Sequence, residues 1–150
     1  MVAAAPKPLF VFAAGNDGLN NDIYPTSPTN IQAGNVISVA ATYKYDFIAP
    51  FSNYGTLMVD VAAPGMLIES QIPGGEYLKV SGTSQAAPMV ANIAAQIKDE
   101  NKNLAPKDIK KILMGTVDAK SFLKDKVKAA GIVNPNRAVH AAKLSLNMDI

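Results

Sequence analysis

The sequence contains no cysteine, and its single histidine is His140. Without cysteine the chain can form neither disulfides nor thiolate metal sites, and the redox state of its compartment stays open. No apolar run approaches the roughly 18 residues that span a bilayer, so we expect no membrane partner. The N-terminal stretch MVAAAPKPLFVFAA has one charge, Lys7, and an apolar run too short for a signal peptide. Residues 1–8 are therefore expected to be a linker, or an added start of the chain, that leads into a strand.

The sequence also lacks a large excess of either positive or negative charge. The net charge is only +2, and the lysines between Lys98 and Lys128 alternate with Asp and Glu. A nucleic-acid-binding surface needs a denser, less neutralised basic stripe with aromatic residues, so we expect no nucleic-acid partner and interpret these lysines as a solvated face. With 150 residues, of which 49% are hydrophobic and 17% are charged, the chain has the size and composition of one soluble globular domain.

Several short apolar runs are bounded by turn residues, which is typical of strands buried on both faces of a parallel sheet. Such strands are expected at Leu9–Ala14, Val36–Ala41 and Val59–Ala63. Two further runs, Met66–Ile72 and Glu76–Val80, flank the turn residues Pro73-Gly74-Gly75. This second pattern predicts a hairpin.

The spacing of apolar residues then changes to that of helices. The alanine-rich segment Thr83–Asn101 has hardly any polar face, so it predicts a helix that is nearly enclosed. Ala105–Thr116, with Pro106 in its first turn, predicts a second helix, and Pro135–Leu146 predicts a third. Buried strands with covering helices indicate an α/β fold, a three-layer, mostly parallel sheet flanked by helices.

Ser84 lies at the start of the alanine-rich helix, in the stretch VSGTSQAAPMVAN. A helix start places unpaired N–H groups and a positive dipole end beside the hydroxyl. Gly82 permits close backbone approach, and Ala86 and Ala87 leave space for another chain. These features favour a nucleophile that attacks an acyl group, where developing negative charge needs hydrogen-bond donors. The same position suits an ordinary N-cap serine, and these residues alone leave both interpretations open.

A second candidate residue, Asn16, follows the first predicted strand in the stretch AAGN. It supplies an amide donor at the carboxyl edge of the predicted parallel sheet, which is where active sites gather. The alternative is a turn asparagine, since Asp17 and Gly18 come next. Taken alone, the stretch does not decide between these two roles.

Together, however, these stretches form a specific series. The segments FVFAAGNDG, NVISVAAT, FSNYG, VDVAAPG and SGTSQAAP occur in an order that resembles the subtilisin-like serine proteases, the subtilases. The resemblance is strong over residues 9–97 and less distinct beyond them. It implies that residues 9–150 are the C-terminal half of a subtilisin-like peptidase domain. It also implies a serine endopeptidase in which Ser84 forms an acyl-enzyme, while the Asn16 side chain and the Ser84 backbone N–H bind the oxyanion.

The resemblance extends to the residues that would contact a protein or peptide substrate. One wall of the primary specificity pocket would be formed by Ala13, Ala14 and Gly15. The surface next to the nucleophile would be lined by Ser81, Gly82 and Thr83, and the Thr83 hydroxyl would give the oxyanion secondary support. Because most subtilases are exported, a secreted or cell-envelope location is expected.

No cofactor is identified from the sequence. Subtilases often bind structural calcium, which needs about six to eight oxygen ligands, and such a site is left open for the complete domain. Asp60 in VDVAAPG is the one acidic residue near a position that the family sometimes uses. A solvent-facing or capping aspartate is the favoured interpretation, so no metal ligand is assigned.

The sequence lacks half of the machinery that the resemblance implies. A serine hydroxyl is a weak nucleophile until a histidine takes its proton, and an aspartate orients that histidine. In subtilases both residues precede the serine, in Asp-Ser/Thr-Gly and His-Gly-Thr motifs that do not occur here. His140 lies downstream, on the third predicted helix, and is expected on its surface.

We therefore expect this chain alone to be inactive. It is either a fragment of an ordinary protease, a natural piece that assembles with a separate N-terminal half, or a degenerate half that serves as a non-catalytic interaction or scaffold module. Intact AAGN and GTSQAAP stretches favour a protease, because a scaffold needs neither an oxyanion donor nor a nucleophile. A half-domain also exposes a sheet edge and apolar helix faces, which predicts self-association.

Overall fold

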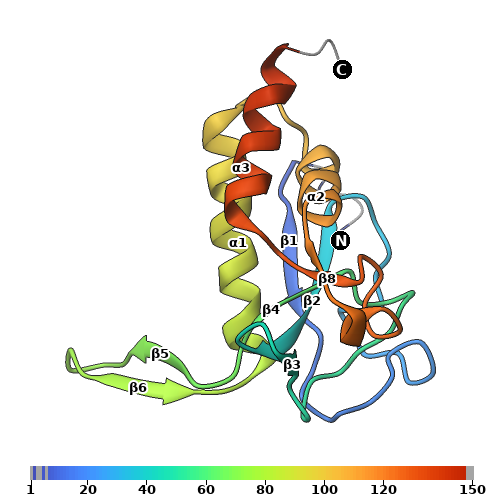
Figure 1. The fold of residues 1–150 in the computed structure, drawn as a ribbon, viewed down its shortest axis with the longest axis vertical. Coiled ribbons are helices and arrows are strands. Elements are labelled where there is room, and N and C mark those ends of the chain that lie inside the picture. Colours follow the sequence, from blue (N-terminus) through green and yellow to red (C-terminus); the bar gives the residue numbers. More distant parts are fainter. Residues whose placement is uncertain (1, 3–4, 6, 148–150) are drawn as a thin grey trace.

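A computed structural model describes residues 2, 5 and 7–147 of the chain. Its main feature is a sheet in which four parallel strands lie side by side (Figure 1). In spatial order these strands are β1 (Phe10–Ala13), β2 (Val36–Tyr43), β4 (Val61–Pro64) and β8 (Gly131–Ile132). The short strands β7 (Asp118–Ala119) and β3 (Phe47–Ile48) add to β8 and β2 in antiparallel orientation. The predicted α/β class with a mostly parallel sheet is confirmed.

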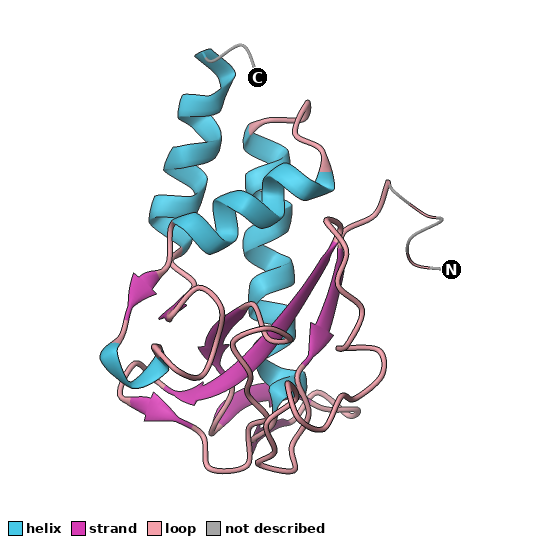
Figure 2. Cartoon of the chain, turned by 90° about the vertical axis from the view of Figure 1, so that its right-hand side faces the viewer, coloured by secondary structure: helices cyan, strands magenta, loops and turns pink. Residues whose placement is uncertain are grey.

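Three helices pack on one face of this sheet (Figure 2). They are α1 (Thr83–Glu100), α2 (Pro106–Gly115) and α3 (Pro135–Leu144), and a 3-10 turn, η2 (Ser145–Asn147), follows α3. Alternate residues of β2, namely Ile37, Val39 and Ala41, point toward the helices and join their apolar core. The opposite face, with Ala40 and Ala62, is covered by Leu123 and Val127 from a segment that contains the 3-10 helix η1 (Ser121–Leu123).

Two burial predictions were wrong, namely that the first strand is buried on both faces and that the first helix is nearly enclosed. β1 is only half-buried, and among the described strands it pairs with β2 alone, so its other edge is open. α1 is not enclosed either, because one of its sides is exposed in this chain, at Pro88, Ala91, Asn92, Ala95 and Gln96. Residues of α1, α2 and β1 border a hollow of about 250 Å³ between these open surfaces.

None of the helices in the described part of the chain combines the length and the apolar composition that a membrane span requires.

The predicted hairpin is present, with shorter strands than expected. β5 (Ile68–Gln71) pairs with β6 (Tyr77–Val80) in antiparallel register, and the two form an arm that projects from the body (Figure 1). The turn includes Gly74 and Gly75, whose φ values of 96° and 81° fall in the region that favours glycine. β6 leads directly into Ser81 and the start of α1, so the arm begins and ends beside the candidate site.

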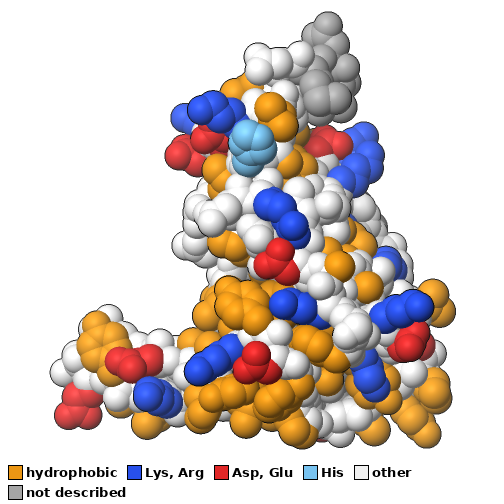
Figure 3. Space-filling view, viewed as in Figure 1, with side chains coloured by type: hydrophobic (Ala, Val, Ile, Leu, Met, Phe, Trp, Pro, Cys, Tyr) orange, Lys and Arg blue, Asp and Glu red, His pale blue; other side chains and the backbone are white. Residues whose placement is uncertain are grey.

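Hydrophobic side chains gather on the surface near the base of this arm and over β3 (Figure 3). Among them, Tyr45 is 52% exposed and Phe47 is 43% exposed. The arm itself carries Tyr77 and Leu78, which are 65% and 53% exposed. Such apolar exposure near one site is typical of a surface that another chain covers.

Candidate active site

The site is built where the parallel strands end. β1 ends at Ala13 and leads into the AAGN turn, while β4 ends at Pro64 and leads into Gly65. The Gly82 N–H donates to the Gly65 carbonyl oxygen over 2.7 Å, which fixes the start of α1 against the end of β4. Two segments that are far apart in the sequence therefore meet at the carboxyl edge of the sheet, where Asn16 was expected.

Asn16 and Thr83 join these two segments. The Asn16 side-chain oxygen Oδ1 accepts hydrogen bonds from the Thr83 backbone N–H and from the Thr83 hydroxyl, each over 2.9 Å. Because a backbone N–H can only donate, the atom that faces it must be the oxygen of the amide. The amide nitrogen Nδ2 of Asn16 is thereby turned away from Thr83 and stays free to donate elsewhere.

The Asn16 nitrogen and the Ser84 backbone N–H border one small space above Gly82. A Cβ atom built on Gly82 would lie 3.6 Å from Asn16 Nδ2 and 3.7 Å from Ser84 N, and its nearest neighbour, at 2.7 Å, would be Oε1 at the end of the Gln85 side chain. Ser84 is the second residue of α1, so its N–H has no acceptor within the helix. Two nitrogen donors beside one glycine, with the flexible end of the Gln85 side chain as the nearest other group, suit the binding of an oxyanion during acyl transfer.

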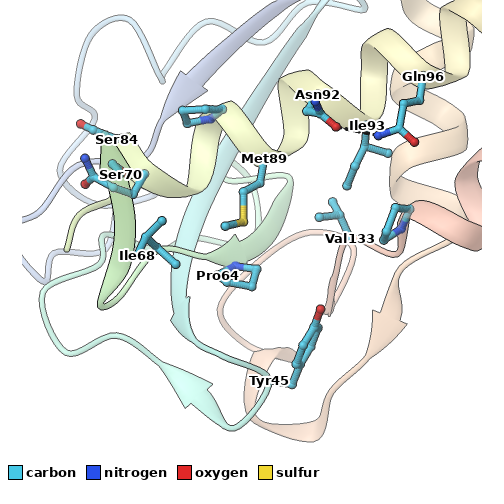
Figure 4. A pocket seen from close by; sticks show the side chains of 13 residues that line it. Tyr45, Pro64, Ile68, Ser70, Ser84, Met89, Asn92, Ile93, Gln96 and Val133 are labelled. Atoms are coloured by element: carbon cyan, nitrogen blue, oxygen red, sulfur yellow. Dashed lines mark hydrogen bonds between the residues drawn. The ribbon is translucent and has the colours of Figure 1, made fainter. Parts of the chain in front are cut away.

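Ser84 itself is accessible. Its side chain is exposed at the start of α1, beside a pocket of about 490 Å³ (Figure 4). The pocket runs along α1 past Met89 and Asn92, and Ile68 of β5 forms part of its far wall. A nucleophile placed at this rim can be reached by a substrate.

The other predicted site residues take more varied positions. The Ser81 hydroxyl accepts from the Leu67 N–H over 2.9 Å and so holds the base of the hairpin. The Thr83 hydroxyl donates its one proton to Asn16, so any support that it gives the oxyanion is indirect in this structure. Ala13 and Gly15 are half-buried, but Ala14 is fully buried in the core, so its side chain cannot form a pocket wall.

His140 is far from this site. It is exposed on α3, as the sequence predicts. The Asn101 side chain at the far end of α1 donates to Ser145 at the end of α3 over 2.8 Å, so the two helices end together. With a rise of about 1.5 Å per residue, α1 alone separates Ser84 from that end by about 25 Å. His140, five residues before Ser145, cannot serve as the base for Ser84.

The interpretation of Asp60 as solvent-facing or capping was wrong. Its side chain is 1% exposed and lies between two lysines, with Lys110 Nζ 3.0 Å and Lys128 Nζ 3.4 Å away. The Ser38 N–H also donates to it over 2.9 Å. Two of the lysines that were assigned to a solvated face are therefore partners of a buried carboxylate.

This arrangement also bears on calcium. Among the described residues, no three His, Asp or Glu side chains are grouped as a metal-binding set. Asp60, the candidate ligand, faces two ammonium groups whose positive charge repels a cation, and of its two oxygens only Oδ2 accepts hydrogen bonds. The residues around Asp60 do not fit a calcium ion.

Sequence reasoning missed two asparagines beneath the AAGN turn, Asn21 and Asn53. Both side chains are 0% exposed, and they are hydrogen-bonded to each other over 3.0 Å. Asn53 belongs to the FSNYG stretch, and Asn21 lies in a run of polar residues after the turn. Both occur in stretches rich in turn residues, where asparagine is common, so nothing in the sequence marked them as buried.

A family model confirms the identity that this geometry indicates. The model of the subtilase family matches residues 2–139. The chain belongs to the subtilase family. The resemblance drawn from the AAGN and GTSQAAP stretches is thereby confirmed.

Individual relatives of this subtilase chain are serine proteases. The thermophilic serine proteinase of Bacillus sp. strain AK1 is 47% identical over 93 residues, which cover 62% of this chain and 22% of that protein. The extracellular basic protease of Dichelobacter nodosus is 39% identical over an alignment of 144 residues, which covers 89% of this chain and 23% of that protein. A protease structure from Pseudoalteromonas arctica PAMC 21717 superposes with a TM-score of 0.75 at 35% identity, covering 88% of this chain and 42% of that one. This subtilase chain spans less than half of each.

Proposed function

We propose that this subtilase chain supplies the nucleophile and the oxyanion donors of a serine endopeptidase. Ser84 is the nucleophile, and the Asn16 side chain and the Ser84 N–H are the donors. The observation that carries this proposal is that Asn16 Nδ2 and Ser84 N both lie beside Gly82, 3.6 and 3.7 Å from the position that a Cβ would take, where the only closer atom is the mobile end of the Gln85 side chain. The N-cap position of α1 is taken by Gly82, and Ser84 is the second residue of the helix, so Ser84 is not an N-cap serine.

In the proposed reaction, the Ser84 hydroxyl oxygen attacks the carbonyl carbon of a peptide bond while a histidine base takes the hydroxyl proton. The carbonyl π electrons move onto oxygen, and the two donors stabilise that negative charge. The tetrahedral intermediate collapses, the C–N bond breaks, and the histidine gives its proton to the leaving amine. Water then hydrolyses the acyl-enzyme by the same steps, which restores Ser84.

The histidine and its aspartate must come from outside these 150 residues. We propose that they belong to an N-terminal half of the catalytic domain, which covers the open edge of β1 and the exposed side of α1. Alone, the chain has no base for Ser84 and is inactive toward peptides. Its open apolar surfaces then favour self-association, and light scattering at micromolar concentration is expected to detect dimers or larger species. A purely monomeric chain would contradict this part of the proposal.

The proposed substrate is a protein or peptide. The relatives named above include an extracellular protease, and a secreted or cell-envelope location is proposed for this chain by analogy. Substrate preference depends on the second wall of the specificity pocket, which these residues do not contain.

Fluorophosphonate labelling followed by intact-mass measurement tests the proposal. The reagent phosphonylates an activated serine, so the complete protein that contains this chain is expected to gain one adduct. A Ser84→Ala variant should gain none, and the isolated chain should stay unlabelled because it lacks the base. A folded complete protein without any adduct would refute the protease assignment and leave a non-catalytic interaction module as the function.

A further inference from the structure

The two buried asparagines beneath the AAGN turn form a connected set of hydrogen bonds. Asn53 Nδ2 donates to Asn21 Oδ1 over 3.0 Å, and Asn21 Nδ2 donates to the Ala14 carbonyl oxygen over 2.9 Å. Asn53 is packed so closely that a Cβ on Gly15 would lie 2.5 Å from its Nδ2 atom. The pair therefore supports the turn from directly below.

Asn53 binds the backbone on both sides of Asn16. Its own N–H donates to the Gly15 carbonyl oxygen over 2.9 Å, and its side-chain Oδ1 accepts from the Asp17 N–H over 2.9 Å. The Gly15 carbonyl belongs to the peptide bond that precedes Asn16, and the Asp17 N–H belongs to the peptide bond that follows it. The same Oδ1 also accepts from the Leu19 N–H over 3.1 Å. One buried residue thus fixes both peptide planes that flank Asn16.

The Asn16 side chain is fixed separately, by Thr83. Thr83 sets which way the amide faces, whereas Asn53 sets where the Cα atom that carries it lies. A donor contributes to catalysis only if it points at the place where negative charge develops, without rearranging during the reaction. Misplacement by about 1 Å can cost as much as 100-fold in rate.

Both asparagine side chains suit this task because an amide offers a donor and an acceptor together. Asn53 uses its oxygen for the turn and its nitrogen for Asn21, which in turn reaches Ala14. Fully satisfied buried polar networks are rigid and favour a single arrangement, because breaking one bond leaves buried groups without partners. An apolar side chain at position 53 would fill the space but lose the bonds to the Asp17 and Leu19 N–H groups, and only the backbone bond to the Gly15 carbonyl would remain.

We propose that Asn53, supported by Asn21, is a positioning residue for the oxyanion donor of this site. It acts through Asn16 and touches neither the substrate nor Ser84. The inference rests on the proposed function, since it assigns Asn53 a role in the same reaction. It predicts that Asn53 contributes to kcat only while the Asn16 amide is present.

The test is a double-mutant cycle on the complete protein, with a peptide substrate. Asn53→Ala is expected to lower kcat by about 10-fold and to leave KM within about twofold, because only the transition state carries the oxyanion. In an Asn16→Ala background the same substitution should change kcat by less than twofold. Asn21→Ala, which leaves the Asn53 bonds to the turn in place, should give a smaller loss of about threefold that likewise disappears without Asn16.

Asn101→Ala is the matched control. Asn101 is also buried, at 4% exposure, and its amide makes two bonds, to Ser145 and to the Asn103 N–H. Because its amide is buried and bonded, Asn101→Ala should lower the midpoint of thermal unfolding, as Asn53→Ala does. Because Asn101 lies at the opposite end of α1 from Ser84, kcat should stay within twofold. This comparison separates positioning from general loss of stability.

Equal losses of kcat from Asn53→Ala with and without the Asn16 amide would overturn the inference, and so would a loss that appears only in KM. If Asn53→Ala fails to fold, the Asn21→Ala cycle decides in the same way. Failure of the proposed function is a different result, since the unsubstituted complete protein would then show no Ser84-dependent turnover. A third result would keep the proposed function and reject the positioning role. In that result Asn16→Ala lowers kcat, and Asn53→Ala lowers kcat by the same further factor whether or not the Asn16 amide is present.

Discussion

A single methyl group at Gly65 is expected to disturb catalysis from below the nucleophile. A Cβ there would lie 2.7 Å from the Gly82 carbonyl oxygen, 2.8 Å from the Ala41 Cβ and 3.0 Å from the Ala86 Cβ. All three neighbours are backbone or Cβ atoms, which cannot turn aside as the end of a long side chain could. Gly65→Ala must therefore push the Gly82 turn, and with it Ser84, away from β4.

The magnitude follows from this crowding. Extra methyl groups in a packed core cost about 1–3 kcal/mol, so the unfolding free energy should fall by that amount. A shift of Ser84 approaching 1 Å is expected to lower kcat by about 10- to 100-fold. The assay is kcat and KM of the complete protein on a peptide substrate, with fluorophosphonate titration to count competent sites and thermal unfolding to check folding.

Gly115→Ala is the control. Gly115 ends α2, a Cβ there would meet nothing within 4 Å, and alanine is the better helix former by about 1 kcal/mol. This variant should keep full activity and equal or greater stability. A Gly65→Ala enzyme with kcat within twofold of the parent would refute the claim that the Gly65–Gly82 contact positions Ser84.

Three further substitutions probe other contacts. Thr83→Val keeps the shape but removes the hydroxyl bonded to Asn16 Oδ1, and kcat of the complete protein should fall by about 10-fold; unchanged kcat would show that the backbone N–H suffices. Asp60→Ala leaves Lys110 partly buried without its carboxylate partner, so the free energy of unfolding, measured in urea, should fall by about 3 kcal/mol. The same substitution at the exposed Asp125 should leave the free energy of unfolding almost unchanged. His140→Ala should leave kcat within twofold, and a collapse would mean that the base has been misidentified.

The local parts of the site could be predicted because they lie within short contiguous stretches. Gly82 and Ser84 lie at the start of an apolar helix, and the helix was placed within one residue of its observed end at Glu100. The contact between Thr83 and Asn16 joins residues 67 positions apart. This contact itself was not predicted, and only the family resemblance placed Asn16 beside the start of this helix.

The elements that escaped prediction depend on distant partners. β3, β7 and β8 are two residues long, so no periodic pattern can identify them, and each exists only through its pairing with a longer or neighbouring strand. Asn53 escaped for the same reason. Its sequence is that of a turn, and its burial depends on Gly15 and Asn21 lying above and beside it.

The wrong predictions have physical causes as well. The apolar character of α1 shows that its surfaces can be buried, but the chain that buries Ala91 and Ala95 need not be this one. Asp60 was interpreted as solvent-facing or capping, yet it is buried, and Lys110, 50 residues away, makes that burial tolerable. Charge partners of this kind cannot be identified from the sequence alone.

The most direct test of the central claim is a crystal structure of the complete protein with a phosphonyl group on Ser84. The phosphonyl oxygen mimics the oxyanion of the tetrahedral intermediate. The account predicts that this oxygen lies about 2.7–3.1 Å from both Asn16 Nδ2 and the Ser84 N. An adduct whose oxygen points into solvent, or is held by other donors while Asn16 stays remote, would contradict the account.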